Sequence, residues 1–345
     1  MNMRNFLLII FSTVALGCKK KIEIASLTTT NPFAITNTSA KSGGTITNDF
    51  GNSITERGVV WSTSPNPTIS LTTKTKDGTG SGSFTSTLPT LIQNTTYYIR
   101  AYATNKNGTT YGNEINFKTL NIDISTDLVA YYPFSGNAND ISGNSNNGTV
   151  MGDVALTTDR FGNSNRAYTF PGKSNSYIDC GTSNSLKISG SITMAAWIYL
   201  DGGYINPRVL NFGNEGSGTN YQISMRGNSN VNRYIDGGIA MSNGQGAFFC
   251  CGSQGSGVNT PSLSWQHIAF TVNDLGVAKS YLNGKLINTI QGTPVKESNY
   301  SNTTLNIGRK NQSAFDAFGG KIDEIRIYKR ALTDEQINYL HAENN

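Results

Sequence analysis

The sequence predicts an all-β protein of two domains, and three observations support this fold class. Charged residues make up only 14% of the 345 residues, well below the ~25% of an ordinary soluble domain. Glycine contributes 37 residues and aromatic residues 10%, a composition typical of strands and turns rather than helices. Apolar and polar residues alternate in short runs bounded by turn residues, which is the pattern of half-buried strands.

The charge pattern gives no support to nucleic-acid binding. The formal net charge is only +5, and the basic residues are scattered apart from the run Lys19–Lys21, without the clustered basic stripe of a nucleic-acid-binding protein. His267 and His341 are the only histidines, which leaves little room for a histidine-rich metal site or a Ser-His-Asp triad. The composition therefore favours a binding or structural protein over an enzyme.

The N-terminus is predicted to be a targeting segment, with residues 1–17 as a signal peptide and 18–26 as a tether. Arg4 makes the start positive, and the apolar stretch from Phe6 to Leu16 is too short to span a bilayer. Cys18 follows Gly17 and resembles the lipobox cysteine of bacterial lipoproteins, which is acylated and becomes the mature N-terminus. The resemblance implies an outer-membrane lipoprotein on either face of that membrane. An ordinary secretory signal with a chance cysteine is the alternative.

The segment 27–120 is predicted to be a β-sandwich, because it holds about seven short alternating strands. Its stretches 57–67 and 94–105 resemble the fibronectin type III-like modules of Bacteroidetes surface proteins. That resemblance implies a spacer whose Trp61 lies in the core. Five of these strands are expected at Thr45–Thr47, Glu56–Ser62, Ser83–Leu88, Thr96–Thr104 and Asn113–Thr119.

After a linker at 121–126, the segment 127–341 has the length of a jelly roll of about a dozen strands. Four of its stretches resemble, in order and spacing, the laminin-G-like jelly rolls of the concanavalin A-like lectin/glucanase superfamily. An N-cap at Thr333 followed by apolar Ile337 and Leu340 predicts a short C-terminal helix. The four stretches are 128–144, 191–198, 265–269 and 322–332.

The resemblance implies that this second domain binds a glycan or an envelope or extracellular protein, with the fibronectin-like module as a spacer. The superfamily also contains glycosidases, which need two carboxylates across the scissile bond. The Glu-x-Asp-x-x-Glu run of its glucanases is missing here, and His267 is interpreted as a structural strand residue. A glycoside hydrolase of the concanavalin A-like class and a purely structural adhesion or scaffold module stay open as alternatives.

Asp140 and Asp323 are the candidate calcium ligands. Asp140 lies in the oxygen-rich loop 137–144, which offers the hard oxygen ligands that calcium accepts. Asp323 is expected to share the inward face of the last strand with Ile325 and Ile327, where a carboxylate needs a metal or a paired charge. Related folds hold calcium between the first loop and the final strand. In the alternative, Asp140 closes an Asx turn and Asp323 pairs with an arginine such as Arg166 or Arg326.

Tyr204, Phe248 and Phe249 are the candidate ligand contacts, because aromatic rings among Gly, Ser and Asn are common in sugar-binding loops. Adjacent strand residues point to opposite faces, so at most one of the two phenylalanines faces solvent. Packing of these loops against the domain is the alternative.

The remaining cysteines predict one disulfide. An oxidising envelope would permit a bond of Cys180 with Cys250 or Cys251 and leave one thiol over. A strained bridge between the adjacent Cys250 and Cys251 is the alternative.

Overall fold

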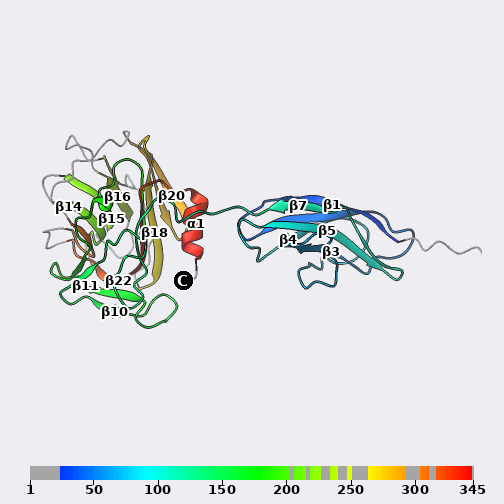
Figure 1. The fold of residues 1–345 in the computed structure, drawn as a ribbon, viewed down its shortest axis with the longest axis horizontal. Coiled ribbons are helices and arrows are strands. Elements are labelled where there is room, and N and C mark those ends of the chain that lie inside the picture. Colours follow the sequence, from blue (N-terminus) through cyan, green and yellow to red (C-terminus); the bar gives the residue numbers. More distant parts are fainter. Residues whose placement is uncertain are drawn as a thin grey trace, which may run out of the picture. The chain divides into compact units, whose positions relative to one another are not determined.

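The computed structural model describes residues 24–201, 206–214, 218–226, 234–239, 247–250, 263–292, 304–310 and 316–343, and Figure 1 shows its ribbon. The chain forms two compact units, residues 1–122 and 123–345. The division falls inside the predicted linker, whose residues 123–126 belong to the second unit. No helix in these described ranges is long and apolar enough to cross a membrane.

The N-terminal unit is a two-sheet sandwich. One sheet has the order β1-β2-β4, and the other has the order β3-β5-β6 with β7 also paired to β5. A buried cluster that includes Trp61 of β3, Leu88 of β4 and Phe117 of β7 joins the two sheets. The strands are β1 (Ser26–Phe33), β2 (Ala40–Asn48), β3 (Glu56–Ser62), β4 (Gly82–Leu88), β5 (Thr96–Asn105), β6 (Gly108–Tyr111) and β7 (Ile115–Lys118).

The C-terminal unit packs an eight-stranded antiparallel sheet against a seven-stranded one. The first has the order β10-β11-β22-β13-β18-β19-β20 with β8 also paired to β22, and the second has the order β17-β16-β15-β14-β21-β12-β9. Their inner faces share one large apolar core. The prediction of an all-β fold with a short C-terminal helix is confirmed. The elements are β8 (Leu128–Tyr132), β9 (Thr149–Met151), β10 (Ala155–Thr157), β11 (Ala167–Pro171), β12 (Tyr177–Asp179), a 3₁₀ turn (Asn184–Leu186), β13 (Ile192–Leu200), β14 (Arg208–Asn214), β15 (Gly218–Arg226), β16 (Tyr234–Ile239), β17 (Ala247–Cys250), β18 (Trp265–Val272), β19 (Val277–Leu282), β20 (Lys285–Gln291), β21 (Leu305–Ile307), β22 (Gly319–Tyr328) and α1 (Asp334–Ala342).

The helix α1 covers the outer face of the eight-stranded sheet, beside β18 and β20 (Figure 1). It begins with a capping box, in which the Thr333 hydroxyl accepts from the Gln336 backbone N–H and the Gln336 side chain accepts from the Thr333 N–H. Such a cap satisfies two donors that the first turn leaves free. Ile337 and Leu340 then pack on Tyr281 and other outward residues of the sheet, which form a second apolar cluster.

A β-bulge in β22 decides which side chains reach this outer face. Glu324 has a positive φ of 51°, and the pairing of β22 with β13 shifts register beside it. The extra residue returns Ile325 and Ile327 to the core with Ile322 and leaves Asp323 on the opposite face. The expectation that Asp323 shares the inward face with Ile325 and Ile327 is therefore wrong, because simple alternation does not hold across a bulge.

Candidate functional site

A pocket of about 330 Å³ opens on the outer face of the eight-stranded sheet, next to α1. Strand alternation places Trp197 of β13 on this face, opposite His267 of β18, and pairs Tyr199 with Trp265 two residues further along. The loop between β10 and β11 and the end of α1 supply the other walls. The residues that line the pocket are Arg160, Phe161, Trp197, Trp265, His341 and Ala342.

Aromatic rings form most of the pocket. The Trp197 and His341 rings are stacked with centroids 5.3 Å apart, and the Tyr199 and Trp265 rings meet edge to face at 5.9 Å. Phe161 is 51% exposed at the rim. The indole Nε1 of Trp197 is buried and makes no hydrogen bond, although a buried indole N–H usually finds an acceptor. The pocket therefore offers aromatic ring faces, beside a buried indole N–H that has no acceptor.

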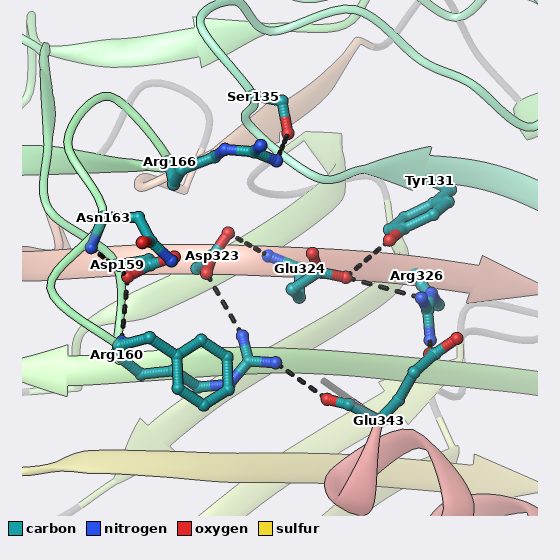
Figure 2. A network of polar contacts seen from close by, with 11 residues as sticks. Tyr131, Ser135, Asp159, Arg160, Asn163, Arg166, Asp323, Glu324, Arg326 and Glu343 are labelled. Carbon is teal, nitrogen blue, oxygen red and sulfur yellow. Dashed lines mark hydrogen bonds and ion pairs between the residues drawn. The ribbon is translucent and has the colours of Figure 1, made fainter. Parts of the chain in front are cut away.

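Arg160 is held between two of these rings. Its guanidinium carbon lies 4.4 Å from the Phe161 centroid and 4.6 Å from the Trp197 centroid. Its Nη1 lies 3.4 Å from Asp323 Oδ2, and its Nη2 donates to the Glu343 carbonyl at 2.9 Å, as Figure 2 shows. The side chain is only 7% exposed. Two ring contacts and two polar contacts fix the guanidinium in the pocket wall.

The loop that carries Arg160 is organised by Asp159. One carboxylate oxygen of Asp159 accepts the backbone N–H groups of Phe161 and Asn163 at 2.8 Å each. The other accepts from the Asn163 side chain at 2.9 Å. These bonds close a compact turn (Figure 2), so the rim of the pocket is preformed.

A chain of ion pairs connects the pocket to β8 and to the end of α1 (Figure 2). Arg326 contacts the carboxylates of Glu343 and Glu324, the latter at 3.4 Å. The Tyr131 hydroxyl donates to the same Glu324 oxygen at 2.7 Å, and the Arg326 guanidinium lies over the Tyr131 ring at 4.1 Å. Both glutamates are thus paired with Arg326, whereas Asp323 faces Arg160.

Burial raises the pKa of one group near the pocket, Asp323, and lowers the pKa of another, His267. Desolvation raises the pKa of Asp323 to about 8, with the neighbouring Glu324 carboxylate adding to this and Arg160 opposing it. Desolvation lowers the pKa of His267 to about 3, helped by His341 and two arginines. His267 is 2% exposed and packs edge-on against Trp197. The structure thus places His267 as a buried, neutral residue on a strand, the environment of a structural side chain.

The donors around Asp140 do not fit a calcium site. One of its carboxylate oxygens accepts the backbone N–H groups of Tyr131 and Ser142, and the other accepts the Asn146 N–H and the Ser142 hydroxyl, all at 2.9 Å. This is the Asx-turn arrangement, in which the carboxylate is surrounded by hydrogen-bond donors rather than by a cation. No group of three or more His, Cys, Asp or Glu that could hold a metal is present among the described residues.

The structure does not bring Asp140 and Asp323 to a shared partner. Asp140 ties the loop after β8 to that strand, whereas Asp323 contacts Arg160 and accepts the Glu324 N–H. Asp323 does pair with an arginine, as the alternative expected, but the partner is Arg160 rather than Arg166 or Arg326. Arg166 donates to the Ser135 hydroxyl, and Arg326 pairs with the two glutamates.

The predicted disulfide is not formed in this structure. Cys180 has a free thiol, is 3% exposed and belongs to the core, and burial raises its pKa to about 12. It follows β12, whereas Cys250 ends β17 at an edge of the same sheet. Four strands lie between β12 and β17, and neighbouring strands are ~4.8 Å apart. A disulfide needs Cα atoms within ~7 Å, so Cys180 and Cys250 are too far apart to form one. Cys251 lies outside the described residues.

The other predicted sites are only partly described. Cys18 and Tyr204 lie outside the described residues. Phe248 and Phe249 lie on β17, where their backbone pairs with Gly238 and Gly237 of β16. Their side chains are outside the description.

A second set of polar residues lies on the outer face of the seven-stranded sheet. Arg208 donates to Ser224 at 2.9 Å and lies 3.6 Å from Asp316, and the Asn211 amide bonds Gln222 at 3.4 Å. Asn211 and Ser224 are fully buried. Arg208 Nε and Asn211 Oδ1 have no hydrogen-bond partner, but the set is buried, so the open pocket beside α1 is the better candidate site.

The sequence analysis did not identify Arg160, Trp197, Trp265 and His341 as ligand contacts. A signal was available for Trp197, because Met194 and Ile198 occupy the inner face of β13 and alternation puts position 197 on the outer one. The sequence around Arg160 gave no such signal. Arg160 contacts Asp323, which is 163 positions away in the chain, so only the folded structure brings the two together.

Several solved structures resemble this chain. Domain 4 of AbnA, an extracellular arabinanase of Geobacillus stearothermophilus solved with arabinotriose, aligns with a TM-score of 0.48 and 23% identity over 62% of this chain and 98% of that one. The binding domain of Paraclostridial Mosquitocidal Protein 1 aligns at 0.48 and 21%, over 64% and 52% of the two chains. The binding domain of botulinum neurotoxin DC, solved with SialylT, aligns at 0.45 and 18%, over 64% and 52%. This chain thus spans about half of the two toxin binding domains.

No curated protein matches the sequence. The sequence profile of the concanavalin A-like lectin/glucanases superfamily matches residues 171–338, which run from the end of β11 into α1 and include Trp197 and Trp265. Residues 171–338 therefore form a concanavalin A-like lectin/glucanase domain of the laminin-G-like kind.

Proposed function

We propose that the C-terminal unit is a carbohydrate-binding module whose site is the pocket beside α1. The observation that carries this proposal is a pocket of about 330 Å³ lined by Phe161, Trp197, Trp265 and His341, with Arg160 fixed in its wall. Specific small-molecule sites are concave, largely apolar and provided with a few placed polar groups. Ring faces suit the C–H faces of a sugar, and the remaining N–H donors of Arg160 suit its oxygens.

The pocket is suited to binding rather than to hydrolysis. None of the six lining residues within the described part of the chain is a carboxylate, and glycoside hydrolysis normally uses two. Asp323 stands behind Arg160 and is engaged with it. Calcium is not part of the proposal, because the Asp140 oxygens already accept four hydrogen bonds.

The rest of the chain is proposed to present this module at the cell envelope. Acylation of Cys18 would anchor the protein in the outer membrane, and the N-terminal unit would act as a fibronectin-like spacer. Support comes from the lipobox-like order at Gly17–Cys18 and from the seven-stranded sandwich of the N-terminal unit. A Cys18→Ser variant should leave the membrane fraction, and unchanged fractionation would contradict the anchor.

The binding proposal is tested with a glycan array followed by calorimetry on the glycans that bind. Phe161→Ala should raise the Kd at least tenfold, equivalent to about 1.4 kcal/mol, because it removes a half-exposed ring at the rim. Phe33→Ala is the matched control, since Phe33 is 46% exposed but lies on β1 of the other unit. A reducing-sugar assay on the same glycans should show no turnover. An array without any bound glycan, or equal losses in the two variants, would contradict the proposal.

A further inference from the structure

The strongest unassigned feature of the pocket is its single charge. Of the six described residues that line the pocket, only Arg160 carries a full charge, and none of the six is a carboxylate. A cationic ligand would meet repulsion there, although aromatic walls alone would suit one. A neutral ligand would leave the charge of the guanidinium without a counter-ion from the ligand.

The guanidinium presents a defined edge. The centroids of the Phe161 and Trp197 rings lie within 4.6 Å of its central carbon, and its N–H donors lie at its edge. Asp323 and the Glu343 carbonyl use two of the five N–H donors of an arginine. The remaining donors lie in the same plane, and planar donors of this kind match the two oxygens of a carboxylate.

The charge of Arg160 is also poorly compensated. Glu324 and Glu343 are both engaged by Arg326, and the contact of Arg160 with Asp323 is long, at 3.4 Å. The neighbouring Asp159 carboxylate also attracts Arg160, but its oxygens accept hydrogen bonds from Phe161 and Asn163 instead. Burial raises the pKa of Asp323 to about 8, so this carboxyl is mostly protonated at neutral pH. A buried cation without a full counter-ion is costly, and an anionic ligand would supply the missing charge.

We propose that the pocket prefers sugars that carry a carboxylate, such as uronic or sialic acid residues, and that Arg160 binds this carboxylate through its free edge. This inference rests on the proposed function and narrows its ligand class. Arg160 is thus a specificity-determining residue, while the surrounding rings hold the sugar ring itself.

The test compares charged and uncharged forms of one sugar. An array carrying uronic-acid, sialylated and neutral oligosaccharides identifies the glycans that bind the full chain. Each bound acidic glycan is then compared with its carboxyl methyl ester, which keeps the ring and removes the charge. The acid should bind at least tenfold more tightly than the ester, and this ratio should shrink as NaCl is added.

Variants then assign the preference to Arg160. Arg160→Gln should bring the ratio of acid to ester affinity close to one. Arg166→Gln is the matched control, because Arg166 lies in the same loop region and contacts Ser135 instead of the pocket. Asp323→Asn is a second test in case Arg160→Gln does not fold. It keeps Arg160 but removes the carboxyl that contacts it, so the ratio of acid to ester affinity should stay the same or increase.

The outcomes separate the two proposals. Equal binding of acid and ester, or binding to neutral glycans alone, would overturn the carboxylate preference and leave carbohydrate binding intact. A preference that survives in folded Arg160→Gln would overturn the role of Arg160. An array on which no glycan binds would overturn the proposed function itself.

Discussion

Asp323 should give the C-terminal unit a measurable dependence of stability on pH. Its carboxyl is buried on the outer face of β22 and has a pKa of about 8, against ~3.9 in an unfolded chain. Between these values the folded state holds a proton that the unfolded state has lost. The free energy of unfolding therefore falls as the pH rises from about 4 to 8.

His267 acts in the opposite direction at lower pH. Its folded pKa of about 3 lies below the ~6.5 of an unfolded histidine, so the unfolded state binds the extra proton between those values. Stability due to His267 thus rises with pH up to about 6.5 and then stays level. The two effects oppose each other below pH 6.5. Between pH 6.5 and 8 the Asp323 effect is the larger one, because the unfolded forms of His267 and of His341, whose folded pKa is also lowered, are mostly neutral there.

We expect the free energy of unfolding to fall by roughly 1–2 kcal/mol between pH 6.5 and 8.0, the order of magnitude that linkage gives for one such carboxyl. Asp323→Asn imitates the protonated form and should remove most of this fall. Asp153→Asn, an exposed carboxyl paired with Lys173, is the control and should keep it. Urea unfolding at the two pH values is the measurement. An unchanged fall in Asp323→Asn would show that another group titrates.

At the scale of single elements, the strands and α1 were largely predictable from the sequence. Local alternation placed Glu56–Ser62 where β3 lies, and the N-cap at Thr333 with Ile337 and Leu340 predicted α1. The face of Asp323 was not predictable, because the bulge at Glu324 exists through pairing with β13. The pocket was not predictable either, since Arg160, Trp197 and His341 meet only after the sheet and helix have packed.

The helix α1 should be a stability element as well as a wall of the site. Ile337 is fully buried and packs with Tyr281, Tyr328 and Leu340. Ile337→Ala should lower the free energy of unfolding by about 2–5 kcal/mol, the usual cost of such a cavity. Because α1 also positions His341 and the Glu343 carbonyl, glycan affinity should fall in parallel.

Glu335→Ala is the matched control for this helix, since Glu335 is exposed on the opposite side and surface changes usually alter stability by less than ~0.5 kcal/mol. Chemical denaturation followed by the tryptophans of the C-terminal unit measures both variants. A loss below 1 kcal/mol in Ile337→Ala would mean that α1 is only loosely packed on the sheet.

At the scale of the whole molecule, the two units each have a core of their own. Composition and turn spacing placed the linker at 121–126, and the structure moves the start of the second unit to Asp123. Local sequence could not indicate this, because what holds Asp123 is a partner about 200 residues away. The Asp123 carbonyl accepts from Arg330 at 2.7 Å and from Gln336 at 2.6 Å, and Ile124 packs on the cluster beneath α1.

The start of a fragment should therefore decide its stability. Residues 123–345 alone should fold, melt at the temperature of the C-terminal unit in the full chain and bind glycan with the same affinity. A fragment that begins at Asp127 loses the acceptor for Arg330 and Gln336, and leaving buried donors unpaired costs ~1–3 kcal/mol. It should unfold at a lower urea concentration by a corresponding amount. Equal stability of the two fragments would place the boundary at Asp127, and failure of residues 123–345 to fold would mean that the two units depend on each other.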